Sequence, residues 1–166
     1  MSTTVKKISN EFLTPLQRLI EFITIAGMLL LIGFLAYHQI ADTGFFTDRF
    51  GSIEMASLYA PALLSLAAPL TRALSGHRNS ARPFEAATNL FLAAGSLWLL
   101  SVFPFNYAHL ADPLPDAIQF VLSWVTNDIA KLFFILQVII CPIAAIAIMW
   151  KYFRVLWLEP AHSSLP

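Results

Sequence analysis

Two pairs of side chains in this sequence have the types and spacing of metal ligands. His38 is followed four residues later by Asp42, and His109 three residues later by Asp112. Imidazole and carboxylate groups bind divalent metals, and these spacings place each pair on one face of any helix that contains it. No HExxH or facing-histidine pattern accompanies them. We therefore favour ordinary polar loop residues, with an outward-facing metal or redox site as the alternative.

Four further polar side chains lie within or at the ends of long apolar runs: Glu54, Asn89, Asp128 and Lys131. An ionisable group costs about 2.5–3.5 kcal/mol at the middle of a membrane helix, so each is a functional candidate. Asp128 and Lys131 are three residues apart, which allows them to pair on one helix face. Two interpretations stay open, a polar cavity and separate groups solvated at the membrane surface.

Other chemistries find little support in the residue types. Cys141 is the single cysteine, so neither an intramolecular disulfide nor a cysteine-based zinc or iron–sulfur site can form. Haem between helices would need histidines on different spans at matching depth. No nucleotide-binding or hydrolase motif is present, and the net charge of zero gives no basic bias toward nucleic acid. We expect no cofactor, no nucleic-acid partner and no enzymatic activity.

The elements that must position these side chains are apolar helices. Hydrophobic residues make up 58% of the 166-residue chain and charged residues 12%, against about 45–50% and about 25% in soluble domains. A spanning helix needs roughly 20 mostly apolar residues. Four runs meet this condition, at 19–39, 53–74, 84–103 and 128–150. The sequence therefore predicts a single all-α domain over 1–166, an integral membrane four-helix bundle.

Prolines mark the second and third spans. Pro61 and Pro69 lie inside the second span, where each removes a backbone donor and can kink the helix. The freed carbonyls need other partners in lipid, so we expect this helix to pack against its neighbours. Pro83 fits the start of the third span, where its missing N–H is not needed.

The connections divide into two long loops and one short loop. The long loops, 40–52 and 104–127, fall on one side of the membrane, and the short loop, 75–83, falls on the other. Residues 117–125 are apolar but too few to span. They form either a short interfacial helix before the last span or an extension of that span.

The basic residues set the orientation. Lys and Arg collect in short cytoplasmic loops. If both ends of the chain lie on the side of the short loop, that side holds eight of the ten basic residues and the other side holds only Arg49 and Lys131. The eight are Lys6, Lys7, Arg18, Arg72, Arg78, Arg82, Lys151 and Arg154. Both ends are therefore expected in the cytoplasm, with the chain in the cell membrane, such as a bacterial inner membrane.

Three functions remain open for a membrane protein with this predicted topology. A non-catalytic accessory subunit or interaction module is favoured, with the bilayer and a membrane protein or a second copy as partners. The outer loop 103–116, rich in aromatic residues and prolines, offers it a contact surface. A small oligomeric transporter or channel is the alternative, and it would use Glu54, Asn89, Asp128 and Lys131. A metal-binding or redox protein is the second alternative.

Overall fold

The computed structural model describes residues 11–158, and nearly all of that length is helical. The bounds are α2 (Pro15–Ile40), α3 (Ser52–Leu64), α4 (Ala67–Ser75), α5 (Arg78–Val102), α6 (Phe120–Ser123) and α7 (Asn127–Leu158), with single 3-10 turns at Tyr107–His109 and Asp116–Ile118. Four segments are long and apolar enough to cross a membrane: α2, α3 with α4, α5, and α7. The all-α prediction and the number of candidate spans are therefore confirmed.

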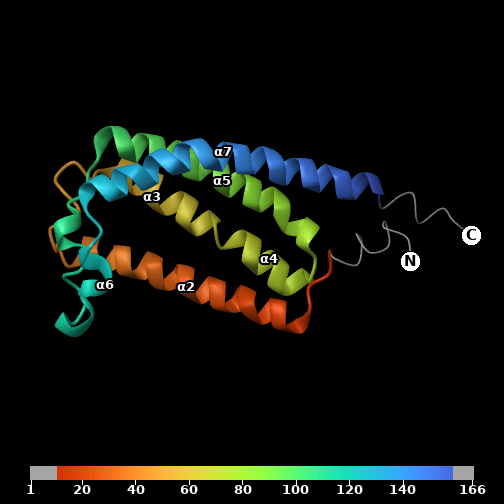
Figure 1. The fold of residues 1–166 in the computed structure, drawn as a ribbon, viewed down its shortest axis with the longest axis horizontal. Coiled ribbons are helices and arrows are strands. Elements are labelled where there is room, and N and C mark those ends of the chain that lie inside the picture. The colour runs from red at the N-terminus through yellow and green to blue at the C-terminus, as the bar shows by residue number, and fades with distance from the viewer. Residues whose placement is uncertain (1–10, 159–166) are drawn as a thin grey trace, which may run out of the picture.

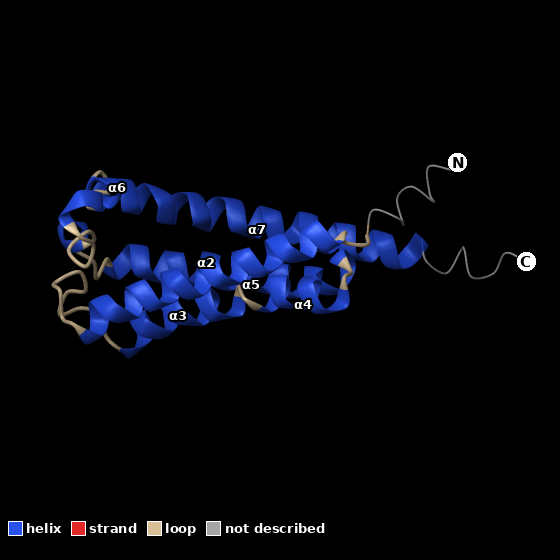
Figure 2. Cartoon of the chain, turned by 90° about the horizontal axis from the view of Figure 1, so that it is seen from below, coloured by secondary structure: helices blue, strands red, loops and turns tan. Residues whose placement is uncertain are grey.

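The four segments run side by side along the length of the molecule (Figure 1). Both long loops gather at one end, which we call the aromatic end, formed by residues 41–51 and 103–126. The start of α2, the turn from α4 to α5 and the last turns of α7 gather at the other, which we call the basic end (Figure 2). Lys6 and Lys7, which entered the orientation argument, lie outside the described residues.

Helix α5 occupies the middle of the arrangement. It packs against α3, α4 and α7, whereas α2 packs mainly against α4. A third of the apolar window of α5 is buried, compared with none of that of α2. Helices α2 and α7 therefore flank the others without a substantial contact between them, and their large apolar side chains point outward.

Local sequence explains where several helices begin and end. Thr14 caps α2 through a reciprocal bond pair with Gln17, and Pro15 fills the first helical position. At the basic end, α4 stops at Gly76, whose φ of 71° is left-handed. Glycine adopts this conformation without the strain that a Cβ would bring, so the turn favours glycine.

The second span is two helices rather than one kinked helix. Helix α3 ends at Leu64 and α4 begins at Ala67, with a turn between them that is visible as a tan segment in Figure 2. Pro61 has no N–H to give to the carbonyl of Ser57, four residues earlier. Gly95 of α5 lies against that oxygen, closely enough that a Cβ there would clash with it. The glycine lets α5 cover the carbonyl that the proline frees, as expected for packing against a neighbour.

The predicted bounds of two segments differ from those of the helices in the structure. Helix α5 begins at Arg78, six residues before the predicted span at 84–103, so Pro83 lies inside it. The predicted loop 75–83 therefore shortens to Gly76 and His77. In segment 117–127, α6 ends at Ser123 and α7 begins at Asn127. Residues 120–123 thus form a separate short helix and not an extension of the last span.

The aromatic end has the main buried hydrophobic cluster, made of Phe45, Leu99, Phe105 and Leu110. Two backbone hydrogen bonds join the loops: Asn106 N donates to Phe45 O at 2.8 Å, and Thr47 N donates to Pro104 O at 3.0 Å. Phe45 is 1% exposed at the centre of the cluster. The two long loops therefore fold together into one ordered cap over the helices.

Candidate binding cavity

The cap fixes one tyrosine firmly. Asn106 caps the turn at Tyr107–His109 by accepting from Ala108 N at 3.3 Å. Tyr107 N donates to the Asn127 side-chain oxygen at 2.9 Å, which ties the turn to the start of α7. The position of Tyr107 is therefore set by its backbone before its ring makes any contact.

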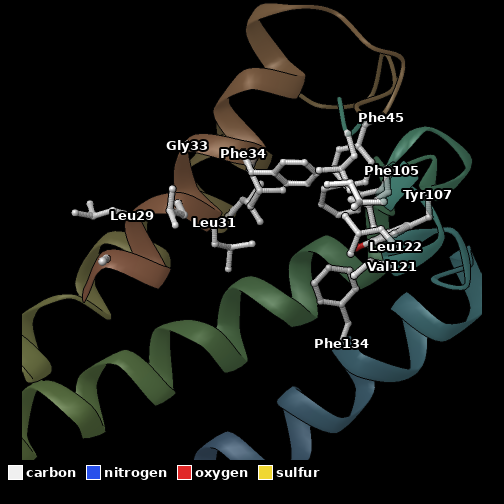
Figure 3. Close-up of a pocket in the computed structure, with 17 residues that line it drawn as sticks. Leu29, Leu31, Gly33, Phe34, Phe45, Phe105, Tyr107, Val121, Leu122 and Phe134 are labelled. Atoms are coloured by element: carbon white, nitrogen blue, oxygen red, sulfur yellow. The ribbon is translucent and has the colours of Figure 1, made fainter. Parts of the chain in front are cut away.

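Neighbouring rings then hold the side chain of Tyr107. Phe45 meets it edge-on at 5.2 Å between centroids, Phe105 lies at 5.9 Å, and Phe103 is stacked at 6.3 Å. Such spacings are within the range of favourable aromatic pairs. The tyrosine ring is thus part of a rigid aromatic wall, which Figure 3 shows beside Phe34 and Phe134.

This wall closes one end of an apolar cavity of about 1310 Å³, which is open to the molecular surface along α2. The cavity lies between α2, the cap and α7 (Figure 3). Its lining residues are Ala26, Leu29, Leu30, Leu31, Gly33, Phe34, Leu35, Phe45, Leu58, Phe105, Tyr107, Leu110, Leu114, Ile118, Val121, Leu122 and Phe134. Aromatic rings gather near the cap, and aliphatic side chains continue along α2. The cavity therefore has an aromatic part and an aliphatic part.

Tyr107 supplies the only polar side-chain atom among these lining residues. No described residue makes a hydrogen bond to its hydroxyl, although its backbone N–H is satisfied. Burial raises the pKa of Tyr107 to about 12. The hydroxyl thus stays protonated at neutral pH and is available as a single neutral donor beside the cavity.

The residues predicted as metal ligands have other partners. His38 is 1% exposed, and its ring nitrogens pair with the Thr43 hydroxyl and, at 3.2 Å, with Leu110 O. Asp42 lies beyond the end of α2 with a φ of 48°, so the four-residue helical spacing does not apply to it. His109 and Asp112 do pair, at 2.8 Å, and both are exposed by more than 40%. The described residues contain no cluster of three or more potential metal ligands.

The four residues of the predicted polar cavity form three separate contacts. Glu54 accepts from Gly51 N at 3.0 Å and from the Trp98 indole at 2.9 Å, which links α3 to α5. The Asn89 amide donates to Glu85 O within α5. Asp128 and Lys131 lie 3.9 Å apart on the surface of α7. No hydrogen bond or ion pair within residues 11–158 joins these three contacts.

An ionic cluster at the basic end was not anticipated. Arg72 of α4 donates to both carboxylate oxygens of Glu21 on α2, at 2.7 and 2.9 Å, and also to Glu85 on α5. The three side chains are only 15–30% exposed. The available signal was that all three lie near the ends of the predicted spans 19–39, 53–74 and 84–103 that face the side assigned to the cytoplasm.

No protein-family model, curated protein or solved structure matches this chain. Its own residues provide the basis for a functional assignment. The strongest features are the apolar cavity under the cap, with one free hydroxyl, and the charged cluster at the opposite end.

Proposed function

We propose that the chain is a non-catalytic membrane protein that acts as an interaction module and holds a neutral lipid in the cavity beneath its cap. The single observation that carries this proposal is a cavity of about 1310 Å³ whose lining offers apolar side chains and one unpaired hydroxyl. The best occupant is a lipid with a flat, uncharged, carbonyl-bearing head and an aliphatic tail, the chemistry of isoprenoid quinones.

The shape of the lining supports this choice. Aromatic rings favour stacked or edge-on contact with a flat head group. The Tyr107 hydroxyl would donate to a carbonyl oxygen, a bond worth about 0.5–1.5 kcal/mol net. No lining residue is charged, so a phosphate or an ammonium group would lose its hydration there without compensation. The aliphatic part beside Leu29, Leu30 and Leu31 suits the tail.

The non-catalytic character is supported by how the polar side chains are used. His38 is held by Thr43 and Leu110, and Glu54 by Gly51 and Trp98. Ser96 donates to Gln137 at 2.7 Å between α5 and α7. Each of these groups is occupied in joining elements of the fold, so each has a structural role independent of any reaction.

The proposal includes a topology. The four apolar segments cross the cell membrane, the chain ends and the α4–α5 turn lie in the cytoplasm, and the aromatic end lies outside. Its support is the eight-to-two distribution of basic residues. Helix α6 exposes Phe120 and Val121 and would lie at the outer membrane surface.

An impermeant thiol reagent tests the topology on intact cells. Arg78→Cys in a Cys141→Ser background should stay unlabelled until the cells are permeabilised. Arg49→Cys should label at once. The reverse pattern would contradict the orientation.

The lipid proposal is tested with decylubiquinone as the probe, added to the full chain in mild detergent. Binding is followed by quenching of tryptophan fluorescence, since Trp124 lies next to the lining segment. Gly33 lines the cavity and has open space where a Cβ would be, and so does Gly27, which is not among the lining residues. Gly33→Leu should therefore weaken binding at least tenfold, whereas Gly27→Leu on the same helix should not.

The hydroxyl has its own test. Tyr107→Phe should weaken decylubiquinone binding about fivefold, the loss of one hydrogen bond of about 1 kcal/mol. Binding of decylbenzene, which has no carbonyl, should not change. Equal binding of decylubiquinone by the two leucine variants would contradict the cavity as the site. If a protein co-purifies with wild type but not with Gly33→Leu, the occupant of the cavity is a protein partner and not a lipid.

A further inference from the structure

The basic end has cations beyond those that its ion pairs use. Glu21 directs both oxygens to Arg72, and Glu85 also contacts Arg72. Arg82 pairs with Glu11 at 2.8 Å. Arg78 and Lys151 form no ion pair within residues 11–158, and both are exposed. The acids of this cluster are therefore turned toward Arg72 and Arg82, which leaves Arg78 and Lys151 without a carboxylate partner among the described residues.

These cations meet at a hollow between helices. A cavity of about 260 Å³ is lined by Glu21, Arg72, Arg78, Arg82, Glu85, Ile148 and Lys151. Arg82 also donates to Lys151 O at 3.4 Å, which holds the start of α5 against α7. The free cations, Arg78 on α5 and Lys151 on α7, thus line one hollow. Arginine and lysine in such an arrangement bind phosphate through charge-assisted hydrogen bonds.

An apolar groove adjoins this hollow. It has a volume of about 440 Å³ and is lined by Ile143, Ile146, Ala147, Trp150, Lys151 and Arg154. Lys151 belongs to the lining of both. Ile143, Ile146 and Trp150 are each more than 60% exposed along α7. A charged hollow and an apolar groove with a shared lysine match an amphiphile that has an anionic head and an aliphatic chain.

We propose that the basic end binds an anionic phospholipid through its phosphate, held by Arg78 and Lys151, while one acyl chain lies along the groove of α7. Basic hollows between membrane helices bind anionic head groups on the cytoplasmic side. The groove selects a membrane lipid over free phosphate, because free phosphate has no chain to place there. This site lies at the opposite end from the cavity under the cap and does not depend on the occupant of that cavity.

The test measures lipid adducts on the full chain by native mass spectrometry. Dioleoyl phosphatidylglycerol, its dihexanoyl analogue, dioleoyl phosphatidylcholine and inorganic phosphate are supplied separately. Wild-type protein should bind dioleoyl phosphatidylglycerol at least tenfold more tightly than the choline lipid. Wild-type protein should also bind dioleoyl phosphatidylglycerol more tightly than its dihexanoyl analogue, which cannot fill the groove. Millimolar inorganic phosphate should not compete.

Matched variants separate this site from general charge attraction. Arg78→Gln with Lys151→Gln should reduce phosphatidylglycerol binding about tenfold. Arg18→Gln with Arg49→Gln removes the same charge outside the hollow and should leave binding unchanged. All four residues are exposed, and circular dichroism checks that both variants remain folded. The proposal is overturned by equal losses in the two double variants, by equal binding of the two dioleoyl lipids, or by competition from inorganic phosphate.

Discussion

The two ends of the molecule are held together by different interactions. At the aromatic end, Phe45 and Phe105 are almost completely buried among other rings. At the basic end, Arg72 joins three helices through Glu21 and Glu85. In the proposed topology, the cap lies where water can drive apolar burial. Helices within the bilayer lack that driving force, and polar contacts or close backbone packing join them instead.

The largest effect is expected from truncating the centre of the cap. Phe45→Ala should destabilise the protein by about 3–5 kcal/mol, because it removes a fully buried ring and leaves a cavity. Unfolding in detergent and proteolysis within residues 41–51 measure this loss. Phe120→Ala removes a ring that is 71% exposed and serves as the control. Similar losses in the two variants would show that the cap is not a hydrophobic core.

High pH should weaken the aromatic end selectively. The pKa of Tyr107 is raised to about 12 by burial, and a free tyrosine has a pKa of about 10. This pKa difference contributes up to about 2.7 kcal/mol to the free energy of unfolding. The contribution is complete below pH 10 and is lost as pH rises through 12. The Arg72 cluster at the basic end contains no tyrosine, so this loss belongs to the aromatic end.

The free energy of unfolding between pH 8 and pH 12 provides the measurement. It should fall more steeply with pH in wild type than in Tyr107→Phe. Parallel pH curves for the two proteins would argue against burial of the Tyr107 hydroxyl.

At the basic end, Arg72→Met should cost about 2 kcal/mol, because partly buried carboxylates lose their charged hydrogen-bond partner. The triple variant that adds Glu21→Gln and Glu85→Gln to this substitution removes the unpaired charges. It should recover most of the lost stability. Thermal unfolding of the three proteins measures both steps. A triple variant as unstable as the single one would indicate that Arg72 acts by packing rather than by charge.

The smallest effect is expected at a hydrogen bond between side chains of α5 and α7 within the bundle. Ser96 donates to Gln137 across α5 and α7, and such interhelical bonds average about 0.6 kcal/mol. A double-mutant cycle with Ser96→Ala and Gln137→Leu should return a coupling of this size. A coupling above about 2 kcal/mol would make this contact as important as the ionic cluster.

The spans were predictable because the thickness of a bilayer demands a long apolar run, which any window of sequence displays. Contacts between residues far apart in the sequence were not predictable. The Arg72 cluster joins residues 51 positions apart, and their meeting depends on how α2 packs against α4. Helical spacing suggested the pairing of His38 with Asp42 as the alternative to ordinary polar loop residues, but α2 ends at Ile40 and the spacing rule does not apply beyond it. The outer loop 103–116 was predicted as a contact surface for a partner, which stays a prediction, and the cavity beneath this loop was not predicted.

The interruption between α3 and α4 has a mechanical consequence. A continuous helix transmits rotation and displacement along its axis, whereas two short helices joined by a turn can tilt separately. Leu58 of α3 belongs to the wall of the apolar cavity, and Arg72 fastens α4 to α2 and α5. The turn at residues 65–66 therefore separates the half of the span that lines the cavity from the half that the Arg72 contacts anchor.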